Sequence, residues 1–421
     1  MTLSRVHRPG DRDVALLFVT RGVRMFAYGS LSVVLVLYLT ALGLSGTETG
    51  LLLTLTLLGD AAVSLWLTTH ADRIGRRRVL VVGAGLMLVA GLCFIATPVY
   101  AVLVVAATIG VISPSGNEVG PFLAVEQASL GQLVGAERRT GIFARYQLAG
   151  SLAAAAGALI AGVIAQLAIE DGARPADGYR LVIIGYAVVG LVLALLFTRV
   201  SARVEAPRRS GTEPPVTSRL GLHRSQRVVL RLAALFALDA FAGGFVIASF
   251  IALWFELRFG ADPAALGALI FGANLLAGLS ALAAGPLAAR FGLVRTMVFT
   301  HLPSNILLML VPLMPTVGLA AAVILLRFSI SQMDVPTRQS YTMAVVAADE
   351  RSAAAGVTGI ARSLGVAASP LIAAPLYLTA GLAWLPFAIA GGLKVAYDLL
   401  LYRGFVGLRP PEEVRSEPPA R

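Results

Sequence analysis

Long apolar runs are the feature of this sequence that most restricts its fold. The chain has 421 residues, of which 57% are hydrophobic and 14% are charged, whereas a soluble domain carries about 25% charged residues. A helix needs about 20 apolar residues to cross the hydrocarbon core of a bilayer. Apolar runs of this length recur along the chain, so the sequence predicts an all-α membrane protein with many spans.

Twelve segments are apolar and long enough to be transmembrane helices. Most connections between them are short, but residues 201–228 are polar, proline-containing and arginine-rich, and they divide the spans into two sets of six. We predict an N-terminal six-helix bundle over 1–200, a cytoplasmic basic linker over 201–228, a C-terminal six-helix bundle over 229–403 and a cytoplasmic tail over 404–421. The predicted spans are 14–42, 48–70, 79–98, 101–126, 140–168, 181–200, 229–257, 264–289, 294–314, 316–346, 353–380 and 382–402.

The basic residues predict how these spans are oriented. If the N-terminus is cytoplasmic, most of the 34 Lys and Arg residues fall on the cytoplasmic side, whereas Arg174, Arg180 and Arg258 fall on the opposite side. We therefore expect both termini in the cytoplasm and a location in the cell (cytoplasmic) membrane. The alanine-rich composition and the single lysine suggest a bacterial source. The net charge of +11 then reflects cytoplasmic turns that meet anionic membrane lipid, and we expect no nucleic acid as a partner.

Several classes of chemistry find no support in the sequence. The single cysteine, Cys93, excludes a disulfide framework or a cluster of thiolate ligands. No Walker loop is present, and Gly83 and Gly85 lack the third glycine of a dinucleotide-binding loop. No nucleophile and base stand at a recognisable spacing. We expect no enzymatic activity, no cofactor and no metal site.

The two halves of the chain are related by a weak internal repeat. The stretch "THADRIGRRR" follows the second predicted span, and "GPLAARFGLVR" follows the eighth. One offset aligns Arg73 with Arg290 and Gly75 with Gly292. Two parallel six-helix repeats are the architecture of one large class of transporters, in which the ligand site lies between the halves near the middle of the membrane.

The turn "ADRIGRRR" at residues 71–78 resembles the signature turn between helices 2 and 3 of the major facilitator superfamily, usually written G-x-L-A-D-R-x-G-R-R. Its Asp-Arg-x-Gly-Arg-Arg core is intact, whereas Thr68 and His70 replace the Gly and Leu of the family. The twelve spans, the basic linker and the second copy of the turn agree with the same family over essentially the whole chain. The resemblance implies two six-helix repeats, transport by alternating access, and a monomer.

This turn is also the predicted cytoplasmic gate. Its arginines cannot enter lipid, and Gly75 permits a tight turn. Asp72 is the one acid of the turn and can accept hydrogen bonds from a helix N-terminus. The resemblance implies that Asp72 latches against span 11 near residues 349–351 when the cytoplasmic side is closed; alternatively, the turn only sets topology. The predicted gating residues are Asp72, Arg73, Gly75, Arg76 and Arg77.

Ionisable residues within the spans are the candidate functional residues, because a charge at membrane depth costs roughly 2.5–3.5 kcal/mol. In the family that the turn resembles, spans 1, 4, 7 and 10 line the central cavity. Span 4 carries "SPSGNEVGP", a polar stretch broken by Pro and Gly, which is tolerated at that depth where it faces water or protein. The candidates for substrate binding and proton coupling are Arg24, Asn117, Glu118, Asp239, Arg327, Asp334 and Arg362.

The roles within this set remain alternatives at the level of sequence. Glu118 and Asp334 are placed to carry protons, because a carboxyl group in a low-dielectric cavity can load and unload near neutral pH. Arg327 and Arg362 could bind an anionic substrate, neutralise Asp334, or both. Asp239 either binds substrate or protons, or forms a structural ion pair with Arg24 or Arg362. For Glu118 and Asp334, too, the alternative is a static salt bridge.

Other polar residues of the spans are expected to be structural. Glu126 falls near the cytoplasmic end of span 4 and is expected to be interfacial. Lys394 and Asp398, at i and i+4 on span 12, are expected to pair with each other. His301 and Asn305 share a face of span 9 and are expected to form a polar pair. Asp60 on span 2 is expected to pack between the halves and couple to their motion.

The sequence favours a proton-driven exporter of a small molecule, because the "ADRIGRRR" turn resembles that of drug and metabolite exporters. The Gly-Pro pair typical of drug–proton antiporters is missing from span 5, where "AGSLAAAAGALIAG" stands. An importer of a polar or charged nutrient is the live alternative, since several charges on pore helices suit such a substrate. A membrane sensor or assembly partner that does not transport is a third possibility.

Overall fold

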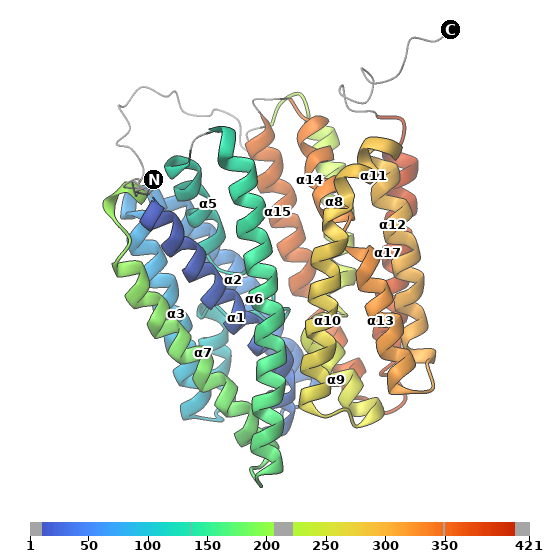
Figure 1. Cartoon of the computed structure of the whole chain (residues 1–421). Helices are drawn as coiled ribbons and strands as arrows, with labels where there is room; N and C mark the ends of the chain where they lie inside the picture. Colours follow the sequence, from blue (N-terminus) through green and yellow to red (C-terminus); the bar gives the residue numbers. More distant parts are fainter. Residues whose placement is uncertain (1–10, 135, 206–221, 348–349, 409–421) are drawn as a thin grey trace, which may run out of the picture. The chain divides into compact units, whose positions relative to one another are not determined.

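All regular elements of the described residues are helices (Figure 1). Eleven helical segments there are long and apolar enough to cross a membrane, and α4 is a shorter apolar helix at the place of the fourth span. The predicted all-α fold with twelve spans is therefore confirmed. The computed structural model describes residues 11–134, 136–205, 222–347 and 350–408.

The chain separates into two compact units. The first unit comprises Met1–Leu42, Gly59–Ser210 and Pro263–Phe271, and the second comprises Gly43–Leu58, Gly211–Asp262 and Gly272–Arg421. Each unit thus contains most of one predicted six-helix bundle and a short segment from the other half of the sequence. Residues 206–221 of the predicted linker and 409–421 of the predicted tail lie outside the described residues.

The helices of the first half begin where local sequence favours a start. α3 begins after Gly75, whose φ of 105° suits glycine, and α7 begins at Pro175, which has no N–H to leave unbonded. The helices are α1 (Asp11–Ala41), α2 (Gly46–Ile74), α3 (Arg76–Ala96), α4 (Tyr100–Ile109), α5 (Phe122–Leu133), α6 (Ala136–Glu170) and α7 (Pro175–Thr198), followed by the short 3-10 helix η1 (Ala202–Val204).

The helices of the second half repeat this order with more interruptions. Gly292 separates α11 from α12 with a φ of 86°, and it is the residue that the internal repeat aligns with Gly75. The elements are α8 (Gln226–Gly244), α9 (Ala248–Phe259), α10 (Pro263–Leu282), α11 (Ala284–Phe291), α12 (Leu293–Leu310), η2 (Val311–Leu313), α13 (Val317–Ser331), α14 (Asp334–Ala344), α15 (Arg351–Ala368), α16 (Pro370–Leu378) and α17 (Leu385–Phe405).

Spans 4, 7 and 10 each consist of two helices. In span 4, residues 110–121 are non-helical between α4 and α5, so the interruption is longer than the predicted span 101–126 suggested. Pro114 lacks a backbone donor, and Gly116 and Gly120 adopt φ values of 71° and 79° that a helix does not contain. We call residues 110–121 the span-4 break. The corresponding interruptions in spans 7 and 10 separate α8 from α9 and α13 from α14.

The first and fifth spans of each half pack closely, α1 on α6 and α8 on α15. A Cβ atom on Gly29 of α1 would lie 1.9 Å from the carbonyl oxygen of Ala154 on α6. A Cβ atom on Gly365 of α15 would lie 2.3 Å from the carbonyl oxygen of Ala237 on α8. Small residues allow helix backbones to approach in this way. The same pairing in both halves agrees with the internal repeat seen in the sequence.

Candidate functional site

Two arginines of α1 form a buried charged cluster with two glutamates in the first unit. Arg24 is fully buried; its Nε donates to Glu118 at 2.8 Å, and its two terminal nitrogens donate to Glu126 at 2.9 and 2.6 Å. Arg21 donates from Nη1 to the other oxygen of Glu118 at 2.5 Å. Two cations therefore face two anions, and each carboxylate has at least one guanidinium partner. We call these four residues the first-unit cluster.

Other groups complete the hydrogen bonding of this cluster. Arg21 donates from Nε to the carbonyl oxygen of Tyr146 at 2.9 Å, and the Tyr146 hydroxyl donates to Glu126. The expectation that Glu126 is interfacial is wrong, since its side chain is fully buried. The reason is the span-4 break: α5 restarts only at Phe122, which leaves Glu126 within reach of Arg24.

Asn117 and Glu118 lie in the span-4 break but differ in their contacts. Glu118 is half-buried and bonded to both arginines of α1. The side chain of Asn117 is exposed, and its backbone carbonyl accepts a hydrogen bond from the Ser113 hydroxyl at 2.7 Å. The structure thus brings Arg24 and Glu118 together and leaves the Asn117 side chain outside the cluster.

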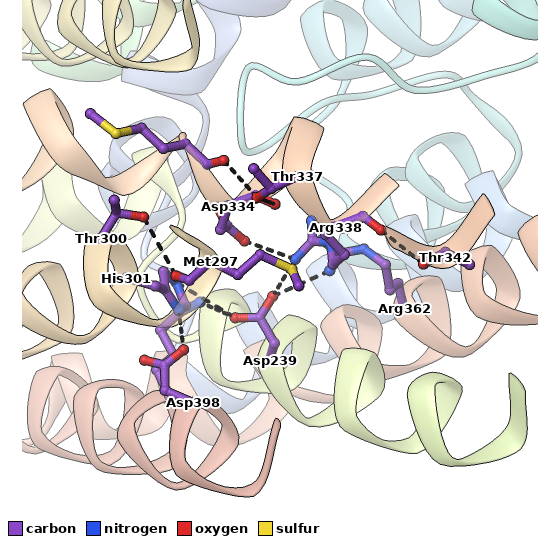
Figure 2. Close-up of polar contacts among 12 residues, drawn as sticks. Asp239, Met297, Thr300, His301, Asp334, Thr337, Arg338, Thr342, Arg362 and Asp398 are labelled. Carbon is purple, nitrogen blue, oxygen red and sulfur yellow. Dashed lines mark hydrogen bonds and ion pairs between the residues drawn. The ribbon is translucent and has the colours of Figure 1, made fainter. Parts of the chain in front are cut away.

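A single carboxylate is the centre of the polar network in the second unit. Asp239 of α8 accepts from Lys394 of α17 at 2.5 Å, from Arg338 of α14 at 3.1 Å and from Arg362 of α15 at 3.2 Å. Figure 2 shows the two guanidinium groups converging on this carboxylate. The Arg362 alternative for an ion pair with Asp239 is the one observed, because Arg24 is bonded to the glutamates of its own cluster.

Asp334 joins the same network through Arg338. The Nη1 atom of Arg338 lies 3.0 Å from Asp334 and 3.1 Å from Asp239, so one guanidinium bridges the two carboxylates (Figure 2). Arg362 has a side chain that is 36% exposed, whereas those of Asp239 and Arg338 are buried. The second-unit cluster is defined as Asp239, Asp334, Arg338, Arg362 and Lys394.

A buried histidine, His301, and a third aspartate, Asp398, lie beside Asp239 (Figure 2). His301 Nδ1 is 2.9 Å from Asp398, and Asn305 donates to the other oxygen of Asp398 at 2.8 Å. The predicted pairing of Lys394 with Asp398 is therefore wrong. The helical spacing was right, but Lys394 reaches Asp239 on α8, and Asp398 bonds to α12 instead.

Arg327 of α13 differs from the other arginines of the spans. Its side chain is buried, and its Nε has no hydrogen-bond partner within the part of the chain that the structure describes. The guanidinium lies 4.8 Å from the centre of the Phe328 ring. Asp239 and Asp334 are close enough to interact electrostatically with Arg327, but the ion pairs of these two carboxylates are with Arg338, Arg362 and Lys394. Arg327 therefore keeps hydrogen-bonding capacity that the protein does not use.

The predicted gating turn contains an ion pair within one helical turn. Arg76 donates from Nε to Asp72 at 2.9 Å, although the Asp72 side chain is 65% exposed. The backbone N–H groups of Arg76 and Arg77 donate instead to Glu205, at 2.6 and 3.3 Å. The acid at this helix N-terminus is thus Glu205 rather than Asp72. The proposed latch partner at residue 349 lies outside the described residues, and Arg73 is exposed.

Sequence reasoning missed Arg21, Glu126, Arg338, Lys394 and Asp398 as members of these networks. Arg338 had a usable signal, since it stands four residues after Asp334 and shares its helix face. Lys394 and Asp398 had no such signal, because their partners are more than ninety residues away in the chain.

Comparison with known proteins places this architecture among transporters. The model of the family described as Major Facilitator Superfamily matches residues 17–370. The uncharacterized membrane protein YJR124C of Saccharomyces cerevisiae is 31% identical over 426 residues, which cover 94% of this chain and 95% of the yeast protein. Because this relative is a yeast protein, the bacterial source suggested by the composition of the chain stays a prediction.

Solved structures with the same fold include the nucleoside transporter NupG, with a TM-score of 0.72, 13% identity, and coverage of 93% of this chain and 99% of that one. A D-xylose-proton symporter has a TM-score of 0.70 at 16% identity, covering 93% and 97% of the two chains. A bacterial homolog of the human lysosomal transporter Spinster has a TM-score of 0.68 at 15% identity, covering 98% and 100%. At these identities the likeness shows the fold.

Proposed function

Because this chain belongs to the major facilitator superfamily, we propose that it is a proton-coupled secondary transporter that moves a small polar or charged molecule across the membrane by alternating access. The observation that carries the proposal is the convergence of three cations from three helices on Asp239. Charges at membrane depth are costly and are retained where they serve transport. A carboxylate with several cationic partners can give up one of them to a substrate without being left unpaired.

The site residues divide into two kinds. Asp239, Asp334 and Arg362 of the second unit, with Arg24 and Glu118 of the first, are ion-paired residues whose bonds would rearrange during transport. Arg327 and Asn117 keep side-chain hydrogen-bonding capacity for a substrate. The turn formed by Asp72, Arg73, Gly75, Arg76 and Arg77 would act as the cytoplasmic gate. The transporter would work as a monomer in the lipid of the cell membrane, and both of its termini would lie in the cytoplasm.

We place export first, because the "ADRIGRRR" turn resembles that of drug and metabolite exporters. Proton-coupled or facilitated uptake of a polar or charged nutrient is the second candidate. The observation that favours uptake is the density of charge within the spans. The two clusters and Arg327 comprise ten ionisable residues, eight of which are buried, so their surroundings are polar.

The test is accumulation of a broad panel of compounds in a host that lacks its main exporters. Cells would express the wild type, Asp239→Asn, Asp334→Asn or the control Asp177→Asn, whose carboxylate forms exposed ion pairs at the start of α7. We expect the wild type and the control to lower the cell content of at least one compound, and the two other variants or a collapsed proton gradient to abolish this. Raised content would establish uptake instead. No change for any compound, with the protein folded in the membrane, would overturn the transport proposal for that panel.

A further inference from the structure

Asp60, in the middle of α2, has a different environment from the carboxylates of the two clusters. Its Oδ1 atom accepts a hydrogen bond from the backbone N–H of Gly120 at 2.7 Å and one from the Ser64 hydroxyl at 3.3 Å. Both donors are neutral. By contrast, Glu118 and Asp239 each accept from at least two cations. A proton that binds to either of those would have to displace an arginine or a lysine, whereas a proton on Asp60 displaces none.

Groups from four other parts of the chain lie around Asp60. They are the hydroxyl groups of Tyr28 on α1 and Tyr186 on α7, the carboxylate of Glu118 in the span-4 break, and the backbone of Thr108 on α4, against which the neighbouring Gly59 packs. Glu118 is the nearest of these groups that carries a charge, and its carboxylate is already paired with Arg21 and Arg24.

The hydrogen bond from Gly120 links Asp60 to the span-4 break. Gly120 adopts a φ of 79° and lies two residues after Glu118. Besides the ion pairs of Glu118 with Arg21 and Arg24, the break is held by neutral hydrogen bonds, among them one from the Tyr186 hydroxyl to the carbonyl of Val111 and one from the Tyr28 hydroxyl to the carbonyl of Val119 at 3.3 Å. A hydrogen bond to a charged carboxylate is stronger than one between neutral groups. Protonation of Asp60 would therefore weaken the hydrogen bond from Gly120 that holds the span-4 break next to Glu118.

We propose that Asp60 is the proton-binding site of the first unit and that its protonation releases the span-4 break and so changes how Glu118 pairs with Arg21 and Arg24. The proton binds to Oδ2, because Oδ1 holds both hydrogen bonds. This inference deepens the proposed function by naming the group that takes the coupling proton. It needs no substrate to be known, since the proton is the ligand.

The direct test is infrared difference spectroscopy of the purified full-length protein in lipid nanodiscs, taken between alkaline and acidic pH. The expected result is a carbonyl band of a buried, protonated carboxyl group that is present in the wild type and lost in Asp60→Asn. The control Glu48→Gln removes a carboxylate from the first turn of the same helix, where it bonds to Ser45, and should keep the band. Retention of the band in a folded Asp60→Asn protein would overturn the proposal.

A second measurement reports the break itself. In a Cys93→Ala background, Ser115→Cys places one thiol in the span-4 break. Its rate of alkylation, corrected with a peptide thiol for the pH dependence of the reagent, should rise several-fold on acidification. Asp60→Asn should make the rate independent of pH and close to the acid value, and Ser64→Ala should shift the midpoint. A corrected alkylation rate that stays constant with pH in the Cys93→Ala, Ser115→Cys protein would contradict the proposed release of the span-4 break.

These two measurements distinguish this inference from the proposed function. If the infrared band and the alkylation change follow Asp60 but no compound is moved in the accumulation assay, the proton switch stands and the transport proposal fails. If compounds are moved in a proton-dependent way that Asp60→Asn leaves unchanged, transport stands and Asp60 is not its proton site.

Discussion

The two buried charge clusters are built in opposite ways. In the first-unit cluster two arginines meet two glutamates, and Arg24 forms a two-pronged pair with Glu126 that is fully buried. In the second-unit cluster three cations share Asp239, and one of them is partly exposed. Among the described residues, the Nε of Arg327 nearby has no hydrogen-bond partner. The first arrangement is closed and balanced, whereas the second has spare cationic capacity. The comparison teaches that the fully buried Arg24–Glu126 pair is held for stability, whereas the second-unit cluster is able to change partners.

The largest expected effect comes from breaking the closed pair. Glu126→Gln leaves the Arg24 charge buried without its main partner, and removing one member of a buried ion pair costs about 3–5 kcal/mol. The free energy of unfolding should fall by that amount, measured by chemical or thermal unfolding in detergent. The control Glu170→Gln, at the exposed end of α6, should change it little. Equal stability of the two variants would refute the structural role of the Arg24–Glu126 pair.

Helix packing offers the next largest effect and compares the same contact in both units. Gly29→Ala and Gly365→Ala would place a Cβ atom 1.9 and 2.3 Å from a backbone carbonyl oxygen, and such overpacking costs about 1–3 kcal/mol. Gly22→Ala and Gly359→Ala, on the same two helices, meet no atom within 4 Å and should be neutral. Thermal unfolding of the four variants checks this prediction. Equal melting temperatures for the variants at the packed glycines and those at the open glycines would contradict it.

A smaller change in stability is expected in the second-unit cluster. Arg362→Gln removes a partly exposed cation from a carboxylate that keeps Arg338 and Lys394, so we expect a loss of at most about 1 kcal/mol. Transport of any compound identified in the panel should nevertheless fall strongly. A variant that is as active as the wild type, or as unstable as Glu126→Gln, would contradict the distinction between the two clusters.

The smallest effect is a pH dependence at the start of α8. Burial raises the pKa of Glu350, but the backbone N–H groups of His223, Arg224 and Ser225 lower it by more, to about 2. Because the folded-state pKa is depressed, the stabilisation is present above the ordinary carboxyl pKa and is lost as the pH falls toward about 2. The difference in melting temperature between the wild type and Glu350→Gln should therefore be constant near neutral pH and shrink in acid. A difference that grows in acid would contradict this sign.

Local patterns were enough to predict the elements but not their partners. The span-4 break follows from Pro114, Gly116 and Gly120, whose combination within seven residues disfavours a continuous helix. The length of the break could not be predicted. Gly110 is the one weak helix breaker among residues 110–113, and a single glycine does not by itself indicate that α4 ends at Ile109. The interfacial placement of Glu126 was wrong for the same reason, since the depth of α5 depends on how much chain the break consumes.

The sequence by itself determined the twelve apolar spans, the two related halves, the family and the presence of costly charges at membrane depth, because each of these follows from the order of residue types along the chain and requires no knowledge of which helices are neighbours. Only the tertiary structure decided which charge meets which: Lys394 goes to Asp239 rather than to Asp398 one turn away, and Glu126 goes to Arg24. An ion pair in a low-dielectric interior is chosen by which helices are neighbours and at what depth each side chain lies. That information is not contained in the spacing along any one helix.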